Sequence, residues 1–211
     1  MNYSSQKRSK DTEKSIKKVA LSYISKYSYE TITLKDIAQT IGIKTPSIYA
    51  HFNSKKQIFI YALKEAKEQE REKLLKLVLS FRTKTAEEVI RNFFYYYTDI
   101  NNIVFWKIIL KQSLGNLPSD LLQILKEDFT KFEKEISIQL KYFFQIGQEE
   151  GWILRKDIDQ MVSLFFTLID GLLSEQNLYK TTVYNKRRDN IWELYKQIIT
   201  YKNNIESINK V

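Results

Sequence analysis

Residues 33–52 of the chain read TLKDIAQTIGIKTPSIYAHF, a stretch that predicts two short helices joined by a tight turn. Thr33 is a candidate N-cap, because an acidic residue follows it three positions later, as in a capping box. Gly42 ends the apolar pattern of the first helix, where a left-handed backbone is needed. Thr45 and Pro46 then open the second helix, with Thr45 as the cap and Pro46 in the first helical position.

The second short helix has an apolar face and a polar face. Ile48 and Phe52, four residues apart, are expected to point into the core. The side chains that remain are short, polar or aromatic, which suits a helix lying in the major groove of DNA. These outward-facing residues are Lys44, Thr45, Ser47, Tyr49, Ala50 and His51.

The pattern from Thr33 to Phe59, T-L-x-D-I-A-x-x-I-G-I-x-x-x-S-I-Y-x-H-F-x-S-K-x-x-I-F, resembles the DNA-binding part of the TetR family of bacterial transcriptional regulators. The resemblance implies a homodimer and a small-molecule pocket in the C-terminal helices, where ligand binding moves the helix that begins at Lys55. It also supports Tyr49, His51 and Lys55 as DNA contacts, because they match positions of the motif. The rest of the chain resembles the family in length and helical pattern only.

The expected DNA contacts fall into two groups. Thr33, Tyr49 and Lys55 are predicted to hold phosphates through hydroxyl and ammonium donors. The other group faces the groove, where Lys44 would read guanine and the Thr45 methyl group would touch a thymine methyl. Pro46 contributes geometry more than contact. The predicted DNA-binding residues are Thr33, Lys44, Thr45, Pro46, Ser47, Tyr49, His51 and Lys55.

The net charge of the chain is +9, and its distribution points to a polyanionic partner. Residues 1–56 contain 11 basic and 4 acidic residues, giving +7, whereas the other 155 residues carry the remaining +2. A lysine-rich composition would explain the total charge but not this asymmetry. A basic segment beside a helix-turn-helix is the pattern of a protein that binds phosphate backbones. Residues 1–10, polar and basic, are expected to form a flexible arm.

Composition also limits the compartment and the chemistry. The chain has no Cys, which fits a reducing compartment and excludes disulfides and thiolate metal sites. The N-terminus lacks the apolar segment of a signal peptide, and the longest apolar stretch, 161–173, is interrupted by Asp170, so no membrane span is expected. One His and no phosphate-binding glycine motif argue against an enzyme. We expect a cytoplasmic, non-enzymatic protein with no metal and no cofactor.

Helical patterns recur along the whole chain, with no sustained strand pattern, so the expected fold class is all-α with about nine helices. The first 56 residues are predicted to form a three-helix DNA-binding domain, and residues 57–211 a helical ligand-binding and dimerisation domain. The helix 55–79 would connect the two. The other helices are predicted at Thr12–Tyr27, 86–100, 103–114, 119–147, 157–179 and 186–204.

The two C-terminal helices are apolar around more than one face, and a helix of that kind must be buried on several sides. The simplest explanation is that both pair with their copies in a second subunit. The alternative is a helix at the centre of a large monomeric bundle. A two-fold dimer would place two recognition helices about 34–36 Å apart, in successive major grooves. The predicted interface residues are Phe165, Ile169, Leu172, Leu173, Trp192, Tyr195 and Ile199.

Aromatic residues are frequent in the C-terminal part, and tyrosine offers an apolar wall with a polar tip, as in many ligand pockets. Ordinary core packing is the alternative for each of them. The hypothesis is an apolar or aromatic ligand, cationic ones included, lined by Phe94, Tyr97, Trp106, Leu110, Phe132 and Phe166.

These features together predict a ligand-responsive, homodimeric DNA-binding regulator, with repression as the expected direction. Two alternatives remain open at this stage. One is a constitutive DNA-binding protein without a ligand. The other is a helical adaptor whose basic end binds polyanions or acidic membrane surfaces.

Overall fold

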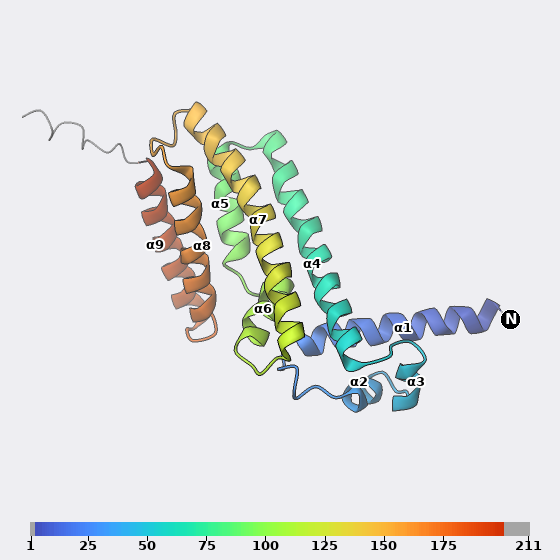
Figure 1. Cartoon of the computed structure of the whole chain (residues 1–211). Coiled ribbons are helices and arrows are strands. Elements are labelled where there is room, and N and C mark those ends of the chain that lie inside the picture. The colour runs from blue at the N-terminus through green and yellow to red at the C-terminus, as the bar shows by residue number, and fades with distance from the viewer. Residues whose placement is uncertain (1–2, 201–211) are drawn as a thin grey trace, which may run out of the picture. The chain divides into compact units, whose positions relative to one another are not determined.

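The computed structural model describes residues 3–200, with side chains from residue 9 onward except that of Phe81. Within these residues the chain forms α-helices and one 3₁₀ turn, without a strand (Figure 1), so the all-α prediction is confirmed. None of the helices within residues 3–200 is long and apolar enough to cross a lipid bilayer. The elements are α1 (Tyr3–Ile24), α2 (Leu34–Thr40), α3 (Thr45–Tyr49), α4 (Lys55–Leu79), η1 (Ser80–Thr83), α5 (Ala86–Tyr97), α6 (Val104–Ser113), α7 (Ser119–Glu149), α8 (Ile158–Glu175) and α9 (Thr181–Thr200).

Helices α1 and α9 begin earlier than predicted. Helix α1 starts at Tyr3, so most of the segment 1–10, expected as a flexible arm, is helical; residues 1–2 lie outside the described residues. The segment contains neither Pro nor Gly and includes Gln, Lys and Arg, which are good helix formers. Helix α9 starts at Thr181, because the polar run that begins there forms the first turn of the helix instead of a separator. Predicted helical residues 201–204 are outside the described part.

The helices group into two compact units. Unit 1 comprises Met1–Glu72 and Val104–Phe132, and unit 2 comprises Lys73–Ile103 and Glu133–Val211. This grouping differs from the predicted division after residue 56, because it places α6 and the first part of α7 with the helices of the first 56 residues. Helices α4 and α7 each contribute residues to both units.

Within unit 1, Gln112 ties α6 to the end of α1. Its amide nitrogen donates hydrogen bonds to the carbonyl oxygens of Ile24 and Tyr27, both at 2.8 Å. Its amide oxygen accepts a hydrogen bond from the backbone N–H of Tyr29 at 2.9 Å. Gln112 is only 1% exposed, so the protein itself satisfies both donors and the acceptor of this amide.

Two polar contacts join α4 to α6 and α7 in the same unit. The buried carboxylate of Glu70 accepts a hydrogen bond at 3.1 Å from the backbone N–H of Phe105, in the first turn of α6. A helix N-terminus stabilises a negative charge, because its first N–H groups lack helical partners. One turn before Glu70, Lys67 forms a largely buried ion pair with Asp128 on α7.

The core of unit 2 is aromatic. The ring of Phe94 on α5 lies 5.9 Å from that of Phe165 on α8 and 5.4 Å from that of Trp192 on α9, measured between centroids. The buried hydroxyl of Tyr195 donates a hydrogen bond to the carbonyl oxygen of Met161 at 2.9 Å. Helices α5, α8 and α9 therefore enclose one another's apolar faces within a single chain.

The same packing includes all the predicted dimer contacts, whose part in an interface stays a prediction. All seven side chains are buried in the chain's own core, with exposures between 0% and 4%. The wide apolar surfaces of α8 and α9 are covered by other helices of the same unit, which the pattern of one helix alone does not reveal. The residues concerned are Phe165, Ile169, Leu172, Leu173, Trp192, Tyr195 and Ile199.

Candidate nucleic-acid interface

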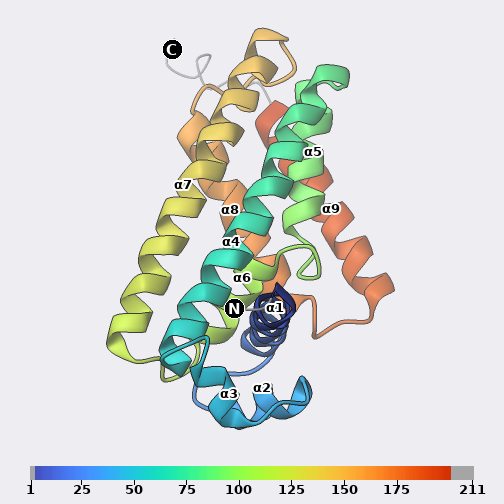
Figure 2. The same ribbon diagram turned by 90° about the vertical axis from the view of Figure 1, so that its right-hand side faces the viewer.

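Helices α2 and α3 lie side by side next to α1 in unit 1 (Figure 2), and the three share a small apolar core. Ile16 of α1 and Ile48 of α3 are fully buried, and Ile37 of α2 is 1% exposed. Phe52, which follows α3, is 5% exposed. The prediction that Ile48 and Phe52 point inward is confirmed. Burial of these side chains fixes which face of α3 remains outside.

The turn between α2 and α3 follows the predicted chemistry. Thr33 is the N-cap of α2, and its hydroxyl accepts a hydrogen bond from the N–H of Asp36 at 3.1 Å. The Asp36 carboxylate accepts the N–H of Thr33 in return, which completes the capping box. Gly42 adopts a φ of 73°, a left-handed conformation that glycine takes without steric cost.

The start of α3 differs from the predicted start by one residue. Lys44 is the N-cap and makes no side-chain capping bond, so Thr45 is the first helical residue and not the cap. Pro46 therefore follows the first helical position instead of occupying it. Pro is tolerated there because N–H groups in the first turn of a helix have no helical acceptor. The N–H of Ser47 still bonds the carbonyl oxygen of Lys44, at 2.9 Å.

The outward face of α3 carries the side chains predicted for it. Tyr49 is 56% exposed, and Lys44, Pro46, Ser47 and Ala50 are also exposed. The remaining two predicted groove residues, Thr45 and His51, are partly exposed. The face is thus polar and aromatic, and a second molecule can reach it.

Thr33, predicted to bind phosphate, already uses its donors inside the chain. Its hydroxyl donates to Asp36 at 2.6 Å, and its backbone N–H donates to the same carboxylate at 3.1 Å. Capping α2 is therefore the role that the structure gives to this residue. A phosphate contact would require the hydroxyl to leave the Asp36 carboxylate.

Lys55 opens α4, and its ammonium nitrogen lies 4.2 Å from the centre of the Tyr29 ring. Burial lowers the pKa of Lys55, while the negative charge of Glu30 acts in the opposite direction. Ser54 caps the helix by accepting the N–H of Gln57 at 3.1 Å. The Gln57 side chain accepts the N–H of Asn53 and not that of Ser54, so Ser54 and Gln57 do not form a reciprocal capping box.

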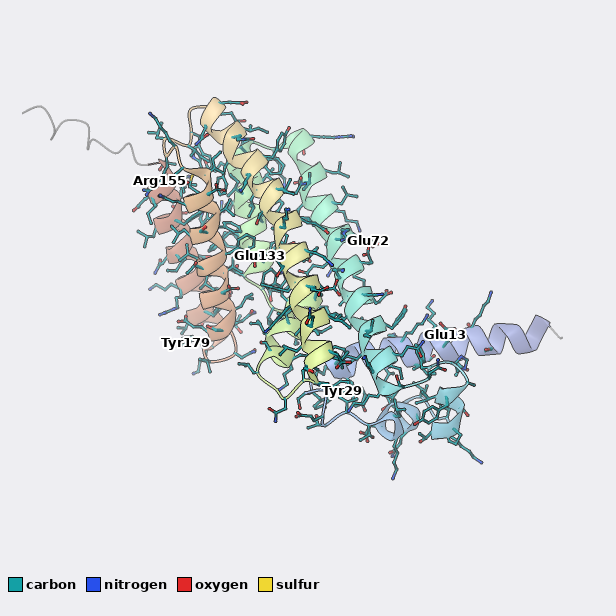
Figure 3. All side chains as sticks on the ribbon, in the orientation of Figure 1. Glu13, Tyr29, Glu72, Glu133, Arg155 and Tyr179 are labelled. Carbon is teal, nitrogen blue, oxygen red and sulfur yellow. The ribbon has the colours of Figure 1, made fainter. Side chains whose placement is uncertain are left out.

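A basic groove runs along α1 where it meets α4, within unit 1. The groove has a volume of about 560 Å³. Glu13, labelled in Figure 3, pairs with Lys17, and the Lys17 ammonium lies 4.1 Å from the centre of the Tyr61 ring. The Lys17 hydrogen bond lowers the pKa of Glu13, with a smaller contribution from the charge of His51. Helical spacing alone indicates a solvated lysine face here and does not reveal the groove.

The predicted ligand-binding residues belong to different units. Phe94, Tyr97 and Phe166 are in unit 2, whereas Trp106, Leu110 and Phe132 are in unit 1. Four of the six side chains are buried, and each contacts an aromatic ring of its own unit. The ring centroid of Trp106, for example, lies 4.9 Å from that of Phe129. Core packing accounts for these contacts, and their role in a pocket stays a prediction.

Residues 3–200 contain no group of three or more His, Asp or Glu side chains that is suited to hold a metal ion.

Known proteins are similar to this chain both in the sequence around α2 and α3 and in the fold. Residues 16–62 match the family model of the bacterial regulatory proteins of the tetR family. IcaR of Staphylococcus aureus (strain Newman), the HTH-type negative transcriptional regulator of the biofilm operon icaADBC, is 27% identical over 156 residues, which cover 67% of this chain and 82% of IcaR.

Solved structures are similar over nearly the whole chain. A regulator from Saccharomonospora viridis in complex with choline has a TM-score of 0.74 at 18% identity, over 92% of this chain and 100% of that one. A TetR-family regulator from Agrobacterium tumefaciens has a TM-score of 0.71 at 16% identity, again over 92% and 100%. At these sequence identities the solved structures show the fold alone. The residues that match the family model, 16–62, include the helix-turn-helix. Residues 16–62 of this chain therefore match the DNA-binding part of the TetR family, and the fold of the chain is that of TetR-family transcriptional regulators.

Proposed function

We propose that the protein is a repressor that binds a palindromic operator as a homodimer and leaves it when a small hydrophobic ligand binds. The observation that carries this proposal is the exposed polar and aromatic face of α3, held in place by the buried Ile48. We assign DNA binding to residues 1–56 and ligand binding and dimerisation to residues 57–211, with the helix from residue 55 to residue 79 as the connector.

On DNA, Tyr49 and Lys55 are assigned to phosphates, and Lys44, Thr45, Ser47 and His51 to the groove. The phosphate contacts set the register and orientation of α3, and the groove contacts read base edges. Tyr49 suits the first role because its ring is exposed and its hydroxyl is at the tip. Pro46 fixes the backbone at the start of the helix.

The experiment is selection of duplexes from a random pool by the purified chain, followed by affinity measurements on the selected site. We expect a palindrome with two half-sites about one helical turn apart, bound at least a thousandfold more tightly than unrelated duplex. Tyr49→Ala is expected to weaken binding to all duplexes alike. Equal affinity for any polyanion would contradict the proposal and favour the adaptor alternative.

For the dimer, the candidate surface is the exposed side of α8, of α9 and of the turn between them. Several apolar side chains there are open to solvent in the single chain, with exposures from 42% to 77%. Gly171 lies on the exposed side of α8, and a Cβ atom added there would meet nothing within 4 Å. A second copy could approach closely at this point. The exposed apolar residues are Leu178, Tyr179, Val183 and Leu194.

Sedimentation equilibrium tests this surface. Leu194→Glu should convert a dimer to a monomer, whereas Leu114→Glu, at a 91% exposed site on the other unit, should leave the dimer intact. A wild-type chain that remains monomeric at micromolar concentration would contradict the proposed dimer.

Two observations favour a cationic ligand: the ligand bound to a structurally similar regulator, and the environment of one carboxylate in this chain. The structurally similar regulator from Saccharomonospora viridis is in complex with choline, an organic cation. In this chain, burial and then the charge of Asp170 raise the pKa of Glu133, so an added cation beside this carboxylate would be stabilised. Aromatic rings and a carboxylate are the usual partners of an organic cation.

Titration of the operator complex with choline, with larger hydrophobic cations and with their neutral isosteres tests the ligand. The cations are expected to release DNA at lower concentration than the neutral compounds, because binding shifts the population to a form that does not fit both half-sites. Release by no compound would favour a constitutive DNA-binding protein.

A further inference from the structure

A polar cavity lies within unit 2, where three segments of the chain meet. They are the loop after α5, the turn between α8 and α9, whose Tyr179 is labelled in Figure 3, and the first two turns of α9. The cavity has a volume of about 350 Å³. Small-molecule sites in proteins begin at about 300 Å³. Its lining is made of side chains that hydrogen-bond, chiefly Asp99, Asn101, Gln176, Tyr184, Asn185 and Arg188.

One wall of the cavity is the carboxylate of Asp99. A single oxygen of this group, Oδ1, accepts hydrogen bonds from the backbone N–H of Asn101, the side chain of Asn101 and the side chain of Gln176, each at 3.0 Å. Although burial alone would raise the pKa of Asp99, these hydrogen bonds hold it below its usual value, so the group is ionised. The other oxygen, Oδ2, accepts no hydrogen bond from the described residues.

Asp99 is also held rigidly in place. The amide oxygen of Gln176 accepts the backbone N–H of Ile100 at 2.7 Å, which fixes the loop to the end of α8. The hydroxyl of Tyr184 on α9 donates to the carbonyl oxygen of Thr98, in a side chain that is 2% exposed. The loop and the two helices thus present the carboxylate in a fixed direction, as a preformed site requires.

The opposite charge comes from Arg188. Its side chain is only 17% exposed, and the guanidinium lies 4.6 Å from the centre of the Tyr95 ring. Asp189 lies 3.5 Å from Nε, yet Nε is buried and makes no hydrogen bond within the described part of the chain. A guanidinium has five N–H donors in a planar fork that matches a carboxylate. Stacking on Tyr95 fixes this fork while leaving its edge available.

We propose that this cavity binds a free α-amino acid, with the ligand carboxylate on the Arg188 guanidinium and the ligand ammonium on Oδ2 of Asp99. Both groups are partly or largely buried, both are charged, and both have hydrogen-bonding capacity that residues 3–200 do not use. A zwitterion satisfies the two at once and leaves the net charge of the cavity unchanged. The amides of Asn101 and Asn185 line the same cavity, where a polar ligand side chain can reach them.

The site is separate from the aromatic residues assigned above to a hydrophobic ligand, and it does not depend on DNA binding. Operator affinity is measured without amino acids, so either proposal can fail while the other stands.

The test is calorimetric titration of the full chain with each of the common amino acids. At least one should bind saturably. The amide of that amino acid lacks the carboxylate and its N-acetyl derivative lacks the ammonium, so each should bind at least about tenfold more weakly. These comparisons use the wild-type chain and need no variant. Absence of saturable binding for every amino acid, or equal binding of the amide or the N-acetyl form, would overturn the proposal.

Variants then locate the ligand. Arg188→Gln and Asp99→Asn should each weaken binding at least about tenfold, and Arg188→Lys, which keeps the charge without the planar fork, should fall between Gln and wild type. Arg187→Gln is the matched control, because Arg187 is the neighbouring arginine and pairs with Glu175. Circular dichroism checks that each variant is folded. Unchanged affinity in a folded Arg188→Gln chain, or equal loss in Arg187→Gln, would place the ligand elsewhere and overturn the assignment.

Discussion

The side-chain oxygen of Gln112 accepts the backbone N–H of Tyr29 at 2.9 Å, although the two residues are 83 positions apart in the chain. The same amide donates to the carbonyl oxygens at the end of α1. We expect Gln112→Leu to lower the free energy of unfolding by about 2–3 kcal/mol, because buried backbone groups would be left without partners. Urea unfolding at a fixed protein concentration measures the change.

Gln145→Leu is the control, since Gln145 is exposed on α7 and the same substitution there should cost less than about 0.5 kcal/mol. Equal stability of the Gln112 and Gln145 variants would show that α6 does not hold the end of α1 in solution.

The features that sequence predicts correctly are those encoded by residues close together. The cap at Thr33, the left-handed Gly42 and the buried Ile48 all act within one or two helical turns, where spacing alone is informative. The predicted cap at Thr45 is wrong by one residue, because Pro46 is compatible with either of the first helical positions. Local chemistry therefore specifies the fold of the DNA-binding helices and which of their side chains face outward.

Long-range partners are not predictable in this way. The sequence predicts that Trp192 and Tyr195 face a second subunit. The spacing of these residues does not show that the rings of Phe94 and Phe165 lie against them within the chain. The sequence does not predict the hydrogen-bond partners of Gln112 either, since a single polar residue in an apolar helix is compatible with many environments. The pairing of sequence-distant side chains requires the three-dimensional structure.

Lys55 is expected to contribute to DNA binding through its charge. Lys55→Met should weaken operator binding and reduce the slope of log K against log salt by about 0.9 for each phosphate that is no longer neutralised. Measurement of affinity by fluorescence anisotropy at several salt concentrations gives this slope. Lys76→Met, at an exposed lysine in the last turn of the same helix, should leave it unchanged. Identical slopes for wild type and Lys55→Met would exclude Lys55 as a phosphate contact.

The ion pair between Lys67 and Asp128 is expected to be strongly coupled, because each side chain is only 14% exposed. Lys67→Met and Asp128→Leu should each destabilise the protein by about 1–3 kcal/mol, and the double variant by less than the sum, since neither charge is then left alone. A double-mutant cycle in urea measures the coupling. The exposed pair of Lys131 and Glu127 provides the comparison, with a coupling below about 0.5 kcal/mol. Equal coupling for the two pairs would contradict the expectation.

Tyr184 should make stability depend on pH in the alkaline range. Burial, foremost, raises the pKa of its hydroxyl to about 12, against about 10 in an unfolded chain. The stabilisation from the neutral phenol is therefore complete below about pH 10 and is lost as the pH rises towards about 12, up to about 2–3 kcal/mol. Tyr184→Phe lacks this group, so its stability difference from wild type should shrink over that range. Parallel pH profiles of the two proteins would contradict the prediction.

Helix α3 spans only Thr45–Tyr49, too short to persist on its own. The orientation of its axis is set by Ile48 and Phe52, whose side chains are buried among the neighbouring helices. If the whole segment is moved into another regulator, the orientation of the α3 axis should therefore change together with the base contacts. Specificity should transfer faithfully only when the solvent-facing positions are exchanged and the anchoring ones are left to the host.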